Sequence, residues 1–147
     1  MSASTHRDWA AHASRTLQDA GHRNARGRRA VVELLASQRC ALTAREIDDT
    51  LRAGGQSIGL ATVYRSLELL ERLKLLTRLD VGQGVSRYEP LQPGGEHHHH
   101  LVCDSCGVIT PFDDPQLERA IERVTRGVRF NVAEHDVVLH GECETCR

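Results

Sequence analysis

The feature that most constrains the fold of this 147-residue chain is a run of four histidines that leads into a Cys-x-x-Cys motif. The run covers residues 97–100, and the motif is formed by Cys103 and Cys106. A tight Cys-x-x-Cys turn presents two thiolates, which is half of a tetrahedral zinc site. The other half is visible near the C-terminus as Cys143 and Cys146. A shared ion would therefore join segments that are 36 residues apart.

Four thiolates favour zinc and leave no open coordination position for catalysis. A redox dithiol is the alternative interpretation of the same motifs. Two close cysteine pairs in a reducing compartment favour metal over disulfides, and the fifth cysteine, Cys40, stands apart. The N-terminal residues lack the apolar core of a secretion signal, and no run approaches the roughly 18 apolar residues of a membrane span. We expect a cytoplasmic protein.

The histidine run can supply ligands to two places at once. In a β-strand, successive side chains point to opposite faces. His97 and His99 would then share one face, and His98 and His100 the other.

Charge is distributed unevenly along the chain. Residues 1–80 hold 13 basic against 9 acidic side chains, whereas residues 81–147 hold 6 against 11. This asymmetry favours a polyanion-binding module joined to a second module, with ordinary surface scatter as the alternative. Only 3% of the residues are aromatic, which argues against a base-stacking platform.

The first half of the sequence predicts helices followed by a hairpin. Apolar spacing predicts a helix over about 8–20 and a second one after the basic run that ends at Arg29. Thr43 and Glu46 have the spacing of a capping box, which predicts a third helix that stops at Gly54. A fourth helix begins at Ser57 or Gly59. Two alternating stretches, 76–80 and 85–89, flank a Gly-rich turn and predict a hairpin. This order is typical of a winged helix-turn-helix.

In that motif the later helix enters the major groove of DNA. Tyr64 and Arg65, together with Thr62, project from the exposed start of the fourth helix, where they could contact phosphates and base edges. The basic run that contains Arg23 and Arg28 adds positive charge. The alternative is that these side chains are solvated or pack locally.

The second half predicts a compact α+β unit. Residues 91–96 form a linker rich in turn-formers, and strands are expected over 97–103 and 108–112. A helix over 115–126, with Leu117, Ile121 and Val124 inward, leads to a longer strand over 128–140. A unit of about 50 residues usually needs a staple or a partner chain. The fold class is therefore α+β: an N-terminal winged helix-turn-helix domain plus a C-terminal α/β domain with metal sites.

Motifs spread over nearly the whole chain occur in a characteristic order. They are Gly21-x-Arg23 with Arg28, Leu42-Thr43-Ala44-x-Glu46-Ile47, Gly59 to Arg65 with Leu67, Arg87-Tyr88-Glu89, His97–Cys103 with Cys106, Glu118, His135, and Gly141-x-Cys143-x-x-Cys146. Taken together, these motifs resemble those of the ferric uptake regulator superfamily of metal-dependent bacterial repressors. The resemblance implies a homodimer with a winged-helix DNA-binding domain over 1–90, a hinge over 91–96 and a metal-binding dimerisation domain over 97–147. It also implies that the metal-bound form binds palindromic operators and represses metal-uptake genes.

The resemblance implies three metal positions. The four paired cysteines correspond to a structural zinc site. A regulatory site at the hinge would use Glu89, His98 and His100, with Cys40 or Asp80 as candidates for a fourth ligand. The ligands of the third site would be His97, His99, Glu118 and His135.

The sensed metal is predicted from departures within the family. Iron and peroxide sensors usually have a histidine where this chain has Ala41, and many iron sensors have an aspartate where this chain has His99. Both departures favour zinc as the regulatory ion, with Fe²⁺ or Mn²⁺ as alternatives. An iron-responsive or peroxide-sensing regulator is the alternative function. A zinc hydrolase or a metal chaperone is a more distant one, and we expect no enzymatic activity.

Overall fold

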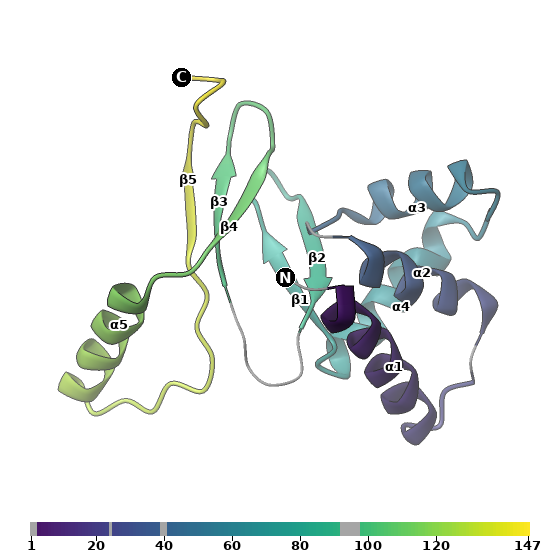
Figure 1. Ribbon diagram of the computed structural model, residues 1–147, viewed down its shortest axis with the longest axis horizontal. Helices are drawn as coiled ribbons and strands as arrows, with labels where there is room; N and C mark the ends of the chain where they lie inside the picture. The colour runs from purple at the N-terminus through teal and green to yellow at the C-terminus, as the bar shows by residue number, and fades with distance from the viewer. Residues whose placement is uncertain (1–2, 24, 39–40, 92–97) are drawn as a thin grey trace. The chain divides into compact units, whose positions relative to one another are not determined.

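The computed structural model describes residues 3–23, 25–38, 41–91 and 98–147 (Figure 1). The chain forms two compact units, Met1–Glu96 and His97–Arg147, called here the N-terminal and the C-terminal unit. Within the described residues, no helix combines the length and the apolar character that a membrane span requires. The predicted linker 91–96 falls outside the described residues, apart from Leu91.

The N-terminal unit starts with the four predicted helices. They are α1 (Ala3–Asp19), α2 (Arg26–Ser37), α3 (Ala44–Ala53) and α4 (Leu60–Arg72). α1 begins five residues before the predicted start, and its Trp9 is fully buried and donates from Nε1 to the carbonyl of Leu75 at 3.1 Å. The apolar faces of the helices meet in one core, whose larger members include Trp9, Leu35, Ile47, Leu67 and Leu70.

The boundaries of α3 and α4 follow from local chemistry. The predicted capping box is confirmed: Thr43 Oγ1 accepts from the backbone N–H of Glu46 at 3.1 Å, and Glu46 Oε2 accepts from the N–H of Thr43 at 2.8 Å. These two bonds satisfy donors that the first helical turn cannot pair internally. α4 starts after Gly59, whose φ of 83° lies in the left-handed region that glycine adopts without strain.

A two-stranded antiparallel hairpin completes this unit. It consists of β1 (Leu76–Asp80) and β2 (Ser86–Pro90). The turn between them has positive φ at Gly82, Gln83 and Gly84, and Asp80 Oδ1 accepts from the N–H of Gly82 at 2.9 Å. Helices α2 to α4 followed by this hairpin confirm the predicted winged helix-turn-helix.

The C-terminal unit is built on a three-stranded sheet and one helix. The strands are β3 (His99–Cys103), β4 (Ile109–Phe112) and β5 (Val138–Gly141), in the order β4-β3-β5. β3 is antiparallel to β4 and parallel to β5. The parallel pairing requires a crossover, which α5 (Pro115–Gly127) supplies between β4 and β5 (Figure 1).

Two predictions for this unit were wrong. The strand expected over 128–140 is much shorter, because the chain turns back at the end of α5: Arg129 has a φ of 54° and the N–H of Phe130 donates to the carbonyl of Thr125. Pairing with β3 then begins only at Val138. Val124, expected to face inward, is 61% exposed, and no residue of α5, all of which is described, is buried within one chain.

Candidate metal centres and DNA-binding surface

The four paired cysteines come together at one end of the sheet. Cys103 ends β3, Cys106 lies in the turn that follows, and Cys143 and Cys146 lie in a turn just after β5. Their four Sγ atoms all lie within 4.8 Å of one another, and Cys106 Sγ is 3.8 Å from Cys143 Sγ. Four sulfurs around a zinc ion at about 2.3 Å would be separated by about 3.8 Å, so the spacing fits a tetrahedral ion.

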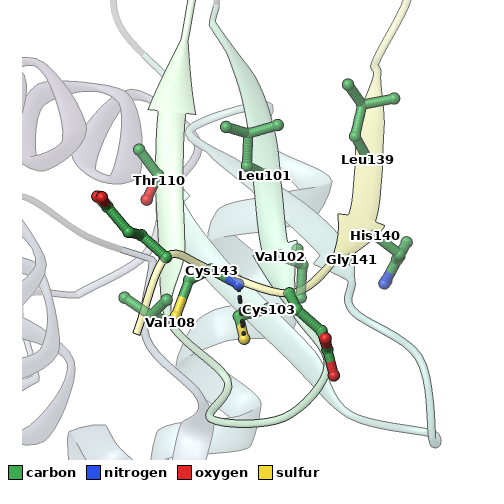
Figure 2. A pocket seen from close by; sticks show the side chains of 11 residues that line it. Leu101, Val102, Cys103, Val108, Thr110, Leu139, His140, Gly141 and Cys143 are labelled. Carbon is green, nitrogen blue, oxygen red and sulfur yellow. Dashed lines mark hydrogen bonds between the residues drawn. The ribbon is translucent and has the colours of Figure 1, made fainter. Parts of the chain in front are cut away.

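Backbone donors make one of these thiols unusually acidic. The N–H of Cys143 donates to Cys103 Sγ at 3.3 Å (Figure 2). This N–H, with help from the N–H of Cys106, lowers the pKa of the Cys103 thiol to about 6. Hydrogen bonds with the Cys143 and Cys106 thiols raise the pKa of Cys146 to about 12. The cluster therefore accommodates one thiolate easily and resists further negative charge, which a divalent cation would neutralise.

A second group of ligand atoms lies on one side of β3. His99, which is 1% exposed, contacts Glu118 Oε1 through Nε2 at 2.7 Å, and His135 Nε2 lies 3.0 Å from Glu118 Oε2. Glu118 belongs to the first turn of α5, which Asp114 caps by accepting from the N–H of Gln116 and the N–H of Leu117. Two imidazoles and a carboxylate form a donor set that suits zinc and other borderline divalent ions. The fourth predicted ligand, His97, lies outside the described residues.

The neighbouring histidines form a separate pair. The rings of His98 and His100 pack edge to face with their centroids 4.8 Å apart, and His100 is buried. The alternation predicted for the histidine run thus separates His99 from His98 and His100. Glu89, the third predicted hinge ligand, lies on β2 of the N-terminal unit. The hinge site therefore stays a prediction, as do its two fourth-ligand candidates.

Those two candidates differ in what is known of them. Cys40 lies outside the described residues. Asp80 lies at the end of β1 and uses its Oδ1 atom in the turn of the hairpin.

The predicted DNA-binding residues gather where the starts of α2 and α4 meet. Arg65 and Tyr64 are exposed, and Arg65 Nη2 lies 3.4 Å from Thr62 Oγ1. Arg28 Nη1 donates to the carbonyl of Arg23 at 2.9 Å. The two helices approach closely at Gly27, where an added Cβ would lie 3.1 Å from Thr62 Cγ2.

Gly27 was not singled out by the sequence analysis. The feature that could have indicated it is its position inside a basic run at the start of a helix. Glycine often occurs at such a position because another element approaches the backbone closely there.

An apolar surface covers part of the sheet in the C-terminal unit. Thr110, Leu101 and Leu139 lie in a row across β4, β3 and β5 (Figure 2). With the segment that carries Cys143, they line an open pocket of about 370 Å³. Among the described residues, six of the eight exposed large apolar side chains belong to this unit, including Leu139 at 50% and Phe130 at 68%. Apolar side chains exposed in this number are typical of a protein interface.

Comparison with known proteins identifies the family. The sequence profile of the Ferric uptake regulator family matches residues 19–140, and the chain belongs to this family. The Ferric uptake regulation protein of Bacillus subtilis is 39% identical over 114 residues, which are 77% of this chain and 76% of that protein. Family members are dimeric, DNA-binding, metal-dependent transcriptional regulators and not enzymes.

Solved structures agree with this assignment. The ferric uptake regulator of Vibrio cholerae superimposes with a TM-score of 0.80 at 32% identity, covering 88% of this chain and 98% of that one. The Helicobacter pylori regulator superimposes with a TM-score of 0.84 at 27% identity, covering 97% and 93%. The structure of that regulator is described as revealing three functional metal binding sites.

Proposed function

We propose that this protein is a zinc-responsive repressor that binds palindromic operators of metal-uptake genes in the cytoplasm. The observation that carries the choice of zinc is the donor set of the His99 group. His99 and His135 contact the same carboxylate at 2.7 and 3.0 Å, and all three donor residues lie within 4.8 Å of one another. A donor set of two imidazole nitrogens and one carboxylate suits zinc, whereas Mn²⁺ prefers sites rich in oxygen donors.

We assign three metal positions to the chain. The cysteine cluster would hold a structural zinc ion, since it combines four thiols, tetrahedral spacing and no open ligand position. His99, Glu118 and His135, with His97, would form the third site. Glu89, His98 and His100 would form the regulatory site at the hinge. The description of three metal sites in the H. pylori regulator supports this number.

The regulatory site would connect the two units of each subunit. Glu89 is followed by the linker 91–96, and His98 and His100 lie directly after it. Sharing one ion between these residues would restrict how the DNA-binding unit can turn on the linker. Reversing a 1:99 population of orientations requires about 5.5 kcal/mol of differential metal affinity. A metal site worth on the order of 10 kcal/mol can supply this.

The apolar surface of the C-terminal unit would form the dimer interface. α5 has an apolar stripe without a buried residue in the single chain, and Leu101 and Leu139 are exposed on the sheet. Pairing of two such surfaces would place two copies of α4 against one operator. In dimeric helix-turn-helix proteins, half-sites lie about 34–36 Å apart.

The test is a metal titration of operator binding. The protein is purified without added metal, its metal content is measured by elemental analysis, and operator binding is then titrated with Zn²⁺, Fe²⁺, Mn²⁺ and Ni²⁺. We expect about one tightly held zinc per chain before any addition, and tight operator binding at the lowest free concentration for Zn²⁺. Operator binding that is unchanged by every metal would contradict the regulatory role.

An iron-responsive regulator is the second candidate. It is supported by the relatives, since the B. subtilis protein with 39% identity is a Ferric uptake regulation protein. The same titration separates the two. Operator binding that responds to Fe²⁺ under anaerobic conditions, at free concentrations where Zn²⁺ has no effect, would favour iron.

A further inference from the structure

We propose that Arg87 and Glu46 are positioning residues for metal control of DNA binding. Together they would hold β2, the strand that carries Glu89, against the helix-turn-helix. This inference rests on the proposed function, in which Glu89 is a ligand of the regulatory ion. It adds the contacts through which a shift of Glu89 would be transmitted to α4.

The guanidinium of Arg87 contacts two residues that lie more than forty positions earlier in the sequence, Ala41 and Glu46. Its Nη1 donates to Glu46 Oε2 at 3.1 Å and to the carbonyl of Ala41 at 3.1 Å. The side chain of Arg87 is only 18% exposed, so much of this contact is removed from water. We call this contact the Arg87–Glu46 bridge.

The backbone beside this bridge is paired as well. The N–H of Leu42 donates to the carbonyl of Tyr88 at 3.0 Å, and the N–H of Tyr88 donates to the carbonyl of Leu42 at 2.8 Å. β2 is therefore bonded on both edges, to β1 on one side and to the segment before α3 on the other. Arg87 and Tyr88 are both fixed, and Glu89 is the next residue.

The other end of the bridge lies on the N-terminus of α3. Glu46 Oε2 accepts from Arg87 and also from the N–H of Thr43, as part of the capping box. A carboxylate at this position is favoured by the helix dipole. α3 in turn packs against α4 through the core that contains Ile47 and Val63. Displacement of β2 is thus coupled to α3, and through α3 to the exposed start of α4.

The bridge contributes to geometry more than to stability. The side chain of Glu46 is 45% exposed, and ion pairs with a partner this accessible to water contribute little to folding. The planar guanidinium of Arg87 donates to two acceptors at once. A lysine ammonium does not do this with the same fixed geometry. Removing it should leave the winged helix folded while loosening β2.

The experiment compares operator affinity with and without regulatory zinc in the full-length dimer. For Arg87→Ala we expect the ratio of the two affinities to fall by about 2- to 30-fold relative to wild type. Glu46→Gln keeps a capping residue and should lower the ratio as well. The double variant should lose no more than the larger single effect, since both changes break one contact. Should Arg87→Ala fail to fold, Arg87→Lys carries the same test.

A direct DNA contact by Arg87 would lower affinity equally in both metal states, so the ratio separates positioning from contact. The matched control is Arg78→Ala, which removes an exposed arginine of the same hairpin whose Nε donates to Ser86 Oγ at 2.9 Å. Its ratio should equal that of wild type. By linkage, operator DNA should raise zinc affinity by the same factor, and Arg87→Ala should reduce that factor too.

A ratio in Arg87→Ala equal to that of wild type overturns this inference and leaves the proposed function intact. A wild-type protein without any metal response overturns both.

Discussion

Glu118 shows how one residue can organise the proposed third metal site. Its two carboxylate oxygens contact His99 and His135 separately, at 2.7 and 3.0 Å. The Asp114 cap fixes the first turn of α5, and β3 fixes His99, so two of the three donors come from rigid elements. A site whose donors are already in place loses little conformational entropy when an ion binds. In the thiol cluster, the N–H of Cys143 likewise orients Cys103 Sγ, to which it donates at 3.3 Å.

At the residue scale, Arg65→Ala should weaken operator binding without changing metal content. An exposed arginine at the start of α4 is placed for base-edge contact, and loss of such a contact costs about 1–3 kcal/mol. Fluorescence anisotropy with labelled operator, together with elemental analysis, measures both effects. Arg72→Ala, at the opposite end of α4, is the control and should bind normally. Unchanged operator affinity in Arg65→Ala would remove Arg65 from the proposed interface.

Cys106→Ser should cause loss of the structural zinc. The exposed Cys106 contributes one of four Sγ atoms, and a serine hydroxyl is a much poorer zinc ligand than a thiolate. Loss of an outer partner of a zinc ligand costs about 10- to 100-fold in affinity, so we expect loss of the ligand itself to cost more than about 100-fold. Zinc release to a chromophoric chelator measures this. Ser105→Ala, in the same turn, should retain zinc; equal zinc retention by both variants would contradict the assignment.

At the scale of elements, α2 and α4 approach each other closely beside the predicted DNA-binding residues. Gly27 lets the start of α2 approach Thr62, which lies two residues before Tyr64. The basic residues of α2 and the polar start of α4 thereby form one surface instead of two. A side chain at position 27 would separate them.

Gly27→Ala should weaken operator binding with a small effect on folding. Alanine favours a helix over glycine by up to about 1 kcal/mol. The new Cβ, 3.1 Å from Thr62 Cγ2, adds an overpacking cost of about 1–3 kcal/mol. We therefore expect a net destabilisation of at most about 3 kcal/mol, measured by thermal unfolding, together with reduced operator affinity.

Gly127→Ala is the matched control for this variant. It lies at the end of α5, and among the described residues no atom beyond its own helix backbone and chain neighbours lies within 4 Å of the position its Cβ would take. It should bind operator normally. An operator affinity of Gly27→Ala equal to that of the control would show that the approach of α2 to α4 does not matter for DNA binding.

At the scale of the whole molecule, the proposed control of DNA binding depends on coupling the N-terminal unit to the C-terminal unit. The N-terminal unit has the large apolar core that contains Trp9 and Tyr88. The C-terminal unit has a short sheet, two groups of metal-ligating side chains and an exposed apolar surface. In the proposed function the linker leaves the units free to reorient, and Glu89, His98 and His100 limit that freedom when they share an ion.

His98→Ala should abolish the metal response of operator binding and leave the fold intact. His98 lies outside the strands, so its loss removes a predicted ligand without disturbing the β3 ladder. Coupling between metal binding and DNA binding typically changes affinity by about 5- to 150-fold. In His98→Ala we expect the ratio of operator affinity with zinc to operator affinity without zinc to approach about one. Gel-shift titration with and without zinc checks this.

His140→Ala removes a histidine that pairs with Asp104 at 2.9 Å, and it should respond to metal like wild type. A normal metal response in His98→Ala would exclude His98 from the regulatory site.

Local sequence chemistry determined most of the elements. The capping box of Thr43 and Glu46, the Gly-rich turn of the hairpin and the two Cys-x-x-Cys turns are set by residues a few positions apart, and each of them is present. The alternation of the histidine run also follows from strand geometry alone. The pairing of the two cysteine turns could be predicted because cysteines in this pattern have few other partners.

Apart from the pairing of the cysteine turns, only the tertiary structure decided the contacts between distant residues. The strand expected over 128–140 is reduced to β5, because the turn at Arg129 and the pairing with β3 outweigh the apolar pattern. His135 lies after that turn and contacts Glu118, and no periodic pattern in the sequence predicts this contact. The Arg87–Glu46 bridge spans 41 positions and joins a strand to a helix cap. Such pairs depend on how whole elements pack. That packing is set by contacts among residues from the entire core, so no local stretch of sequence determines it.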